Sequence, residues 1–341
     1  MPEPASIAPS GRWEALAAAV LAGDPLTRDD ALAVLRSGDE ELLALLLAAF
    51  RVRHAHFGRK VKLNVLVNAK SGLCAEDCGY CSQSVVSTAP VAKHSLLSRE
   101  KLVEGAREAW ARKAGTYCIV ASGRRPSRRE LAEVTAAVRE IKQELPLKIC
   151  TCLGLLSAEE ARELREAGVD RYNHNLNTSP DNYARITTTH SYEDRVDTVE
   201  AVKEAGISPC SGLIAGMGER DEDLVELAFA LRDLDADSIP VNFLNAIPGT
   251  PLEGTDELDP RRCLRILTLL RFACPAKEIR VAGGREVQLG SLQPLALYPA
   301  NAIFLGDYLT TSGQDAEADY RMIADLGFEI EECALPDPSP A

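Results

Sequence analysis

Residues 71–84 read Ser-Gly-Leu-Cys-Ala-Glu-Asp-Cys-Gly-Tyr-Cys-Ser-Gln-Ser and place Cys74, Cys78 and Cys81 in one short segment. The segment follows an apolar run over 62–67 that is typical of a strand. Three thiolates at this spacing can bind one face of a four-iron cluster, which takes four ligands. One iron then lacks a protein ligand, and an open coordination position admits chemistry. The segment therefore predicts a catalytic iron–sulfur cluster in a loop after the first strand.

A structural zinc site is the alternative interpretation of these cysteines. It would need a distant fourth ligand such as His94. Zinc modules more often use two separated Cys-x2-Cys pairs. The spacing therefore favours the iron–sulfur cluster.

Beyond this segment, short β-branched runs alternate with amphipathic helical stretches. We expect helices at 98–113, 128–144, 158–167, 192–205, 221–233 and 260–272. We expect strands at 62–67, 116–121, 147–153, 171–175, 208–214, 238–244, 278–282 and 302–305. Eight alternations predict a (β/α)8 barrel of the TIM type. In such a barrel, active-site groups lie at the C-terminal ends of the strands.

The remaining regions divide as follows. We expect a disordered N-terminus at 1–11, a helical extension at 12–58, the barrel at 59–328 and a disordered Pro-rich tail at 329–341. The extension contains three expected helices, at 13–22, 31–35 and 39–56. It carries no residue pattern that suggests catalysis, and a dimer contact is an alternative use for it.

The composition limits the classes of partner. The 341 residues are 46% hydrophobic and carry a net charge of −13, without the dense basic stretch that a nucleic-acid groove needs. The longest apolar run, 42–50, is too short to cross a bilayer, and the start of the chain lacks a basic secretory n-region. Ten cysteines without such a signal indicate a reducing compartment, so we expect the cytoplasm.

Further cysteines fall on the predicted strands. Cys118 lies on the second, Cys150 and Cys152 on the third, and Cys210 on the fifth. A single strand cysteine is usually a small core residue, but cysteines on three strands of one barrel can converge on a second cluster. Residues i and i+2 of a strand share a face, so parity alone does not separate Cys150 from Cys152.

The fourth strand continues into an asparagine-rich run, Tyr172-Asn-His-Asn-Leu-Asn177. If the strand continues, Asn173, Asn175 and Asn177 share one face and His174 takes the other, as a structural histidine. Amides offer both donors and acceptors, which suits a pocket for hydroxyls and a urea-like ring. An asparagine-rich turn is the alternative.

The three-cysteine loop, with Tyr80 before its last cysteine, resembles the radical S-adenosylmethionine (SAM) superfamily. The segments 116–118, 149–154, 209–219 and 279–286, together with Asn173-His-Asn175, resemble the biotin synthase family, and the resemblance covers roughly residues 50–330. It implies a 4Fe–4S cluster on Cys74, Cys78 and Cys81 with SAM on the open iron. It also implies a 2Fe–2S cluster whose ligands are Cys118, Cys150, Cys210 and Arg280, with Cys152 a bystander.

The arginine ligand rests on the resemblance alone, because a guanidinium is normally a protonated donor. The resemblance also implies residues that bind SAM: Tyr80, Asn175, Asn177, Arg195 and Glu219. Residues that it implies for the substrate are Asn175, Asn242, Thr310 and Thr311. Asn177 departs from the family pattern, which often has aspartate at that position.

The implied function is a sulfurtransferase that converts dethiobiotin to biotin. SAM is cleaved at the 4Fe–4S cluster, and sulfur from the 2Fe–2S cluster is inserted between C6 and C9. Implied partners are a flavodoxin- or ferredoxin-type reductant, iron–sulfur assembly proteins and a second copy of the chain in a homodimer. Two alternatives stay open: another radical SAM barrel enzyme with the 4Fe–4S cluster alone, and an electron-transfer iron–sulfur protein.

Overall fold

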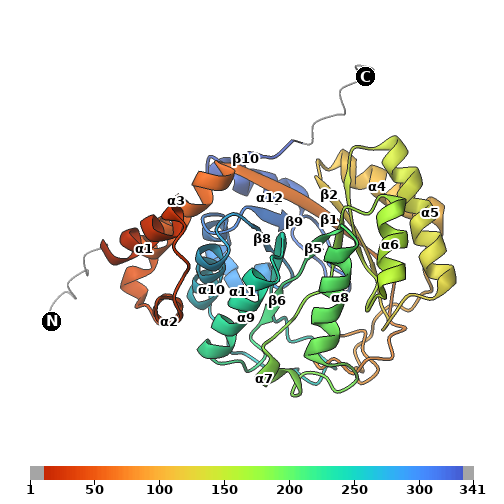
Figure 1. Ribbon diagram of the computed structural model, residues 1–341, viewed down its shortest axis with the longest axis horizontal. Coiled ribbons are helices and arrows are strands. Elements are labelled where there is room, and N and C mark those ends of the chain that lie inside the picture. Colours follow the sequence, from red (N-terminus) through yellow and green to blue (C-terminus); the bar gives the residue numbers. More distant parts are fainter. Residues whose placement is uncertain (1–10, 333–341) are drawn as a thin grey trace.

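The computed structural model describes residues 11–332, and Figure 1 shows their arrangement. The strands that the chain forms are β1 (Lys60–Lys70), β2 (Thr116–Ala121), β3 (Lys148–Cys152), β4 (Arg171–Asn173), β5 (Ser208–Cys210), β6 (Leu213–Ala215), β7 (Ser238–Phe243), β8 (Glu278–Val281), β9 (Ala302–Phe304) and β10 (Glu329–Ile330). Neighbouring strands pair in the order β1-β2-β3-β4-β5-β7-β8-β9, and β9 pairs with β1 to close the sheet. The strand pairs are parallel, so the predicted (β/α)8 barrel is confirmed.

Helices surround the barrel and connect its strands. They are α1 (Gly11–Ala22), α2 (Arg28–Leu35), η1 (Asp39–Glu41), α3 (Leu42–Phe57), α4 (Arg99–Ala111), α5 (Arg128–Glu144), α6 (Ala158–Ala167), α7 (Pro180–Tyr183), α8 (Tyr192–Glu204), α9 (Asp221–Asp233), α10 (Pro260–Ala273), α11 (Arg285–Leu289), η2 (Gly290–Leu297) and α12 (Ala316–Asp325). Several begin at a serine whose hydroxyl accepts from the third helical residue, as Ser127, Ser157 and Ser191 do. This capping satisfies backbone donors that the first turn leaves free.

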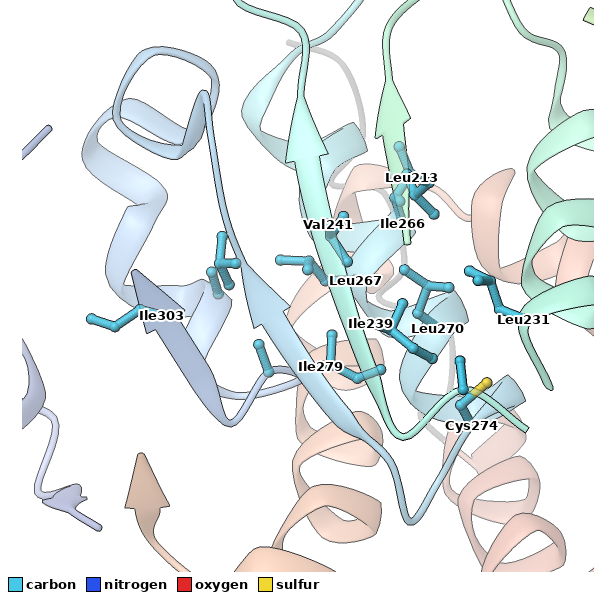
Figure 2. Close-up of a cluster of buried hydrophobic side chains, with 14 of the residues drawn as sticks. Leu213, Leu231, Ile239, Val241, Ile266, Leu267, Leu270, Cys274, Ile279 and Ile303 are labelled. Carbon is cyan, nitrogen blue, oxygen red and sulfur yellow. The ribbon is translucent and has the colours of Figure 1, made fainter. Parts of the chain in front are cut away.

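The barrel has an apolar outer layer. Figure 2 shows Ile239 and Val241 of β7 and Ile279 of β8 in one cluster with Leu267 and Leu270 of α10. Side chains alternate between the two faces of a strand, so the neighbours of Ile239, Val241 and Ile279 along their strands point into the barrel. On β8 those inward residues are the charged pair Glu278 and Arg280, where a TIM barrel interior normally holds apolar layers.

Seven of the eight predicted strands have both ends within three residues of the observed ones, and the fifth differs more. The fourth strand stops at Asn173, and the chain meets the sheet again only at Asn177, which has a left-handed φ of 70° and forms a single parallel bridge with Leu213. The fifth divides into β5 and β6 around Gly212. A Cβ at Gly212 would lie 1.9 Å from the carbonyl oxygen of Pro240, so the chain passes against β7 where only glycine fits.

The N-terminal helices pack beside the barrel. In Figure 1, α1, α2 and α3 lie to one side, next to α10, and α2 also contacts α9. Ion pairs join the two parts: Arg36 with Asp221 at 2.8 Å, and Arg265 with Asp39 at 2.7 Å. Among the described residues, no helix has the length and apolar character needed to cross a membrane.

Both expected chain-end boundaries differ from the structure. Gly11 already belongs to α1, and positions 1–10 lie outside the described residues. At the other end, Glu329–Ile330 pairs with the first residues of β1, Lys60 and Val61, so the tail does not begin at 329. The start of β1 offers backbone groups there that β10 satisfies. The Pro-rich stretch at 333–341 lies outside the described residues.

Candidate functional site

A cavity of about 400 Å³ lies at the C-terminal ends of the barrel strands. It brings together fourteen of the residues singled out in the sequence: Cys74, Cys78, Tyr80, Cys81, Cys118, Cys150, Cys152, Asn175, Asn177, Arg195, Asn242, Arg280, Thr310 and Thr311. The N-terminal helices contribute no lining residue. The two groups of cysteines therefore share one cavity, although 37 residues separate Cys81 from Cys118.

Hydrogen bonds hold the three-cysteine loop against the segment before α8. The carboxylate of Asp77 accepts from the Thr187 hydroxyl at 2.6 Å and from the Thr188 backbone N–H at 2.9 Å. The backbone N–H of Gly79 donates to the Ile186 carbonyl at 2.8 Å. Because the loop has no helix or strand of its own, these bonds set its shape.

Burial disfavours the thiolate form of two of the loop cysteines, Cys78 and Cys81. Burial raises the pKa of the Cys81 thiol to about 11, and burial also raises the pKa of Cys78. A bound iron removes this cost, since metals bind the thiolate. His94 does not line the cavity, and its Nδ1 hydrogen-bonds the Ser95 carbonyl at 2.9 Å. Across residues 11–332, no three His, Cys, Asp or Glu side chains are arranged around a single metal ion. The zinc alternative gains no support.

The second group of cysteines is aligned by the sheet. Cys118 of β2 pairs in register with Cys150 of β3, and Cys210 of β5 pairs with Asn173 of β4. The side chains of Cys118, Cys150 and Cys210 pack together in one buried cluster. The three sulfur atoms thus converge inside the barrel, as a shared cluster requires.

The environment of Cys210 favours a thiolate. Its pKa is lowered to about 6 by the neighbouring Cys150 thiol and by the positive charges of Arg280 and Arg171, against the effect of burial. The Asn173 amide also donates to its sulfur at 3.4 Å. Cys210 itself is fully buried beneath the cavity lining.

Cys152 stands two residues along the same strand face as Cys150. It pairs in register with Val120 and lines the cavity. Burial raises its pKa to about 12, the opposite of the shift at Cys210. Its environment is that of a neutral thiol.

Arg280 lies in a buried ionic cluster on the barrel floor. Its Nη2 is 2.5 Å from Glu278 Oε1 and 3.0 Å from the Ser238 hydroxyl. The other oxygen of Glu278 meets Arg171 at 2.7 Å and Lys62 at 3.0 Å. The buried Arg280 Nε has no hydrogen-bond partner among the described residues. Lys62 also lies 3.5 Å from the partly exposed Glu331, so two carboxylates face three cations and leave one excess positive charge below the sulfur atoms, which fits an anionic iron–sulfur cluster.

The asparagine run turns its amides toward the cavity without forming a strand. Asn173, Asn175 and Asn177 all line the cavity, but so does His174, which we expected on the opposite face. The expected register fails because β4 ends at Asn173. Burial lowers the pKa of His174 well below its usual range, so this imidazole is neutral.

Four of the residues implied for SAM form two hydrogen-bonded pairs in the cavity wall, and the fifth lies apart. Asn177 donates to the Tyr80 hydroxyl at 2.7 Å, and Arg195 donates to the Asn175 carbonyl at 2.8 Å. Glu219 lies outside the cavity lining. Its carboxylate accepts from the backbone N–H groups of Gly216 and Met217, each at 2.7 Å, and so shapes the turn after β6.

The residues implied for the substrate come from two loops and a strand. The amide of Asn242 joins β6 to the segment after β8, since it donates to the Leu213 carbonyl at 3.1 Å and accepts from Gly283 N–H at 3.0 Å. The Thr310 hydroxyl lies 2.8 Å from that of Ser82 in the cysteine segment. Thr311 lines the same stretch of wall.

Some cavity residues were not recognised from the sequence. Glu76, Ser82, His190 and Tyr308 all line the cavity. Glu76 could have been recognised from its position in the sequence, because it lies between two cysteines of the predicted cluster loop. His190 contacts Glu76 across 114 residues, and spacing gives no hint of such a contact.

Two family models match the chain. A model described as the radical SAM superfamily matches residues 70–231, and one described as the biotin and thiamin synthesis associated domain matches residues 240–329. A relative from Bacillus cytotoxicus named biotin synthase is 60% identical over 323 residues, or 95% of this chain and 97% of the relative. A biotin synthase from Geobacillus kaustophilus is 61% identical over 324 residues, with the same coverage.

Solved structures share the fold. Methylornithine synthase aligns with a TM-score of 0.81 at 22% identity, covering 93% of this chain and 97% of that one. The FeFe-hydrogenase maturase HydG from Carboxydothermus hydrogenoformans aligns with a TM-score of 0.79 at 17% identity, covering 96% of this chain and 80% of that one. At these identities the likeness concerns the fold alone.

Proposed function

This chain belongs to the biotin synthase family, and we propose how its residues divide the work of that reaction. The chain is a sulfurtransferase of the radical SAM type and converts dethiobiotin to biotin. The family uses a 4Fe–4S cluster, a 2Fe–2S cluster and SAM. When bound, these groups supply a 5′-deoxyadenosyl radical at one end of the cavity and a sulfur atom at the other.

One observation carries the proposed division: the loop cysteines and two of the strand cysteines, Cys118 and Cys150, line a single cavity that also contains the amides and hydroxyls, and Cys210 is buried beside them. We assign the 4Fe–4S cluster to Cys74, Cys78 and Cys81, and the 2Fe–2S cluster to Cys118, Cys150, Cys210 and Arg280. A substrate between the two is then within reach of both. The enclosing walls exclude water from a reactive carbon centre.

The polar residues of the walls bind and orient. We assign Arg195 to the SAM carboxylate, because a guanidinium can bind a carboxylate with two parallel hydrogen bonds. Tyr80, Asn175 and Asn177 are assigned to the rest of SAM, and the contacts of Glu219 support an indirect role through its turn. For dethiobiotin we assign Asn175, Asn242, Thr310 and Thr311.

The deciding experiment is an anaerobic assay of the reconstituted protein with dethiobiotin, SAM and dithionite, with biotin followed by mass spectrometry. We expect biotin, together with 5′-deoxyadenosine and methionine. An enzyme with the 4Fe–4S cluster alone would form 5′-deoxyadenosine without biotin, and an electron-transfer protein would form neither. Neither alternative is favoured, given the family of the chain.

Three further assignments concern partners and location. We propose a flavodoxin- or ferredoxin-type reductant and iron–sulfur assembly proteins, because both clusters must be built and one must be reduced. We propose the cytoplasm, because the nine cysteines among the described residues are free thiols and would oxidise elsewhere. A homodimer is proposed on the exposed leucines of α3, Leu43 and Leu47. Light scattering of Leu43→Glu against wild type tests the dimer.

A further inference from the structure

His190 lies between the cysteine loop and the arginine assigned to SAM. Its side chain is 4% exposed and precedes the N-cap of α8, Ser191. Its Nδ1 is within hydrogen-bond distance of Glu76 Oε2, and its Nε2 lies 2.8 Å from Arg195 Nη2. Glu76 stands two residues from Cys74 and two from Cys78. A continuous chain of contacts therefore runs from the cluster loop to Arg195.

The direction of these hydrogen bonds follows from chemistry. A guanidinium has only donors, so the His190 Nε2 facing Arg195 must accept. In a neutral imidazole the other nitrogen then carries the proton. Nδ1–H consequently donates to the Glu76 carboxylate. Burial and the charge of Arg195 lower the pKa of His190, which agrees with the neutral form.

Arg195 has donors left over for a ligand. Its Nη1 donates to the Asn175 carbonyl at 2.8 Å, and its Nε donates to the Tyr183 hydroxyl. With Nη2 bound to His190, three of the five guanidinium N–H groups are engaged. One N–H remains on each Nη nitrogen, and Arg195 lines the cavity.

Glu76 has its own connections. It accepts from the Thr189 hydroxyl at 2.8 Å and lies 3.4 Å from Arg124 Nη1. Asp77 beside it binds Thr187 and Thr188. The Glu76 carboxylate is thus held in place independently of His190, so it can fix the orientation of the His190 imidazole.

We propose that His190 is a positioning residue that fixes the Arg195 guanidinium relative to the three-cysteine loop. The SAM carboxylate can then bind Arg195 while SAM also binds the open iron of the cluster. The inference rests on the proposed function, specifically on Arg195 binding the SAM carboxylate. His190 thus belongs to the SAM site through its contact with Arg195, and no direct contact with SAM is assigned to it.

Two substitutions separate the two ends of the imidazole. In His190→Asn, the amide nitrogen can replace Nδ1 and donate to Glu76, but the contact with Arg195 is lost. In His190→Gln, the amide oxygen can reach the Nε2 position and accept from Arg195, whereas Glu76 loses its donor. His54→Asn, on an exposed face of α3, is the matched control.

We expect His190→Asn to raise the KM for SAM about tenfold, the value of one charge-assisted hydrogen bond. His190→Gln is expected to stay within about threefold of wild type and His54→Asn within about twofold. The 4Fe–4S content, measured as iron and acid-labile sulfide, should match wild type in all three. The shift of the reduced cluster's EPR signal with added SAM gives the affinity without turnover.

Equal losses in the two His190 variants, or a loss of 4Fe–4S content in His190→Asn, would overturn the proposal. Arg195→Gln tests its premise. If Arg195→Gln weakens SAM binding and His190→Asn does not, the His190 inference alone fails. If Arg195→Gln has no effect, the assignment of Arg195 fails and the inference falls with it. Should His190→Asn not fold, a tenfold loss of SAM affinity in His190→Gln overturns the proposal.

Discussion

The two groups of cysteines reach the same cavity by different means. Cys74, Cys78 and Cys81 lie in a loop whose shape depends on side-chain bonds to the segment before α8. Cys118, Cys150 and Cys210 lie on three strands, where backbone pairing aligns them. The first group is close in sequence and lies nearer the surface, with two half-buried members. The second is dispersed in sequence and fully enclosed.

This difference matches two tasks. A loop can present an iron to SAM, a ligand that must enter and leave. A sheet interior holds its thiols rigidly and away from solvent, which suits a group that gives up sulfur beside a reactive carbon. The positive charge around Arg280 and the low pKa of Cys210 belong to the second site alone. Substitutions that disrupt one site at a time therefore test whether the two sites have separate tasks.

The largest expected effect separates the two sites by their products. Cys78→Ala should abolish formation of 5′-deoxyadenosine, by about 100-fold or more, because the radical-generating cluster loses a ligand. Cys118→Ala should lose biotin but keep most SAM cleavage. Chromatography of dithionite-driven reactions measures both products. If both variants are equally inactive in 5′-deoxyadenosine formation, the two sites are not separable.

The next effect concerns two cysteines on one strand. Cys150→Ser should lose the 2Fe–2S cluster, so that the iron content falls from about six to about four atoms per chain. Cys152→Ser should retain both clusters, because Cys152 is not part of the buried group of Cys118, Cys150 and Cys210. Mössbauer spectra distinguish the cluster types. The opposite result would make Cys152 the ligand.

A smaller effect concerns the ionic cluster beneath the second site. Glu278→Gln leaves Arg171 and Arg280 without their carboxylate and Lys62 with Glu331 alone, and should cost the apoprotein about 3–5 kcal/mol of unfolding free energy. Urea unfolding measures it, with Asp39→Asn as the control, whose partly exposed ion pair should matter far less.

The pH dependence of this loss has a definite sign. Despite full burial, the charges of Arg280, Arg171 and Lys62 hold the pKa of Glu278 well below its usual range. A carboxylate whose pKa is depressed on folding stabilises above its unfolded pKa, about 4.3, and loses that contribution as the pH falls. The gap between wild type and Glu278→Gln should therefore be full at neutral pH and narrow below about pH 4. A gap that widens in acid would contradict the ion-pair account.

The smallest expected effect concerns the link between the cysteine segment and the substrate loop. Ser82→Ala removes the partner of the Thr310 hydroxyl and should raise the KM for dethiobiotin about two- to fivefold. Ser84→Ala is the control, since this buried hydroxyl has no hydrogen-bond partner within residues 11–332. Steady-state kinetics with varied dethiobiotin checks both. A raised KM for SAM in place of dethiobiotin would place Thr310 at the other ligand.

The sequence was informative where chemistry is local or periodic. The barrel follows from eight alternations, and the loop of Cys74, Cys78 and Cys81 follows from spacing. Long-range contacts were not predictable: the bond between His190 and Glu76 depends on two loops meeting after the chain has folded. The end of β4 was missed because the residue types at 174–177 permit an extended strand, whereas regular pairing stops at Asn173 and resumes only as a single bridge between Asn177 and Leu213.

The central claim is that the strand cysteines hold the sulfur that enters biotin. Its most direct test is a single turnover of protein whose 2Fe–2S cluster was rebuilt with isotopically heavy sulfide, followed by mass spectrometry of the biotin. The account predicts that the first biotin carries the heavy isotope and that Cys150→Ser forms none. Unlabelled biotin from the labelled protein would contradict it.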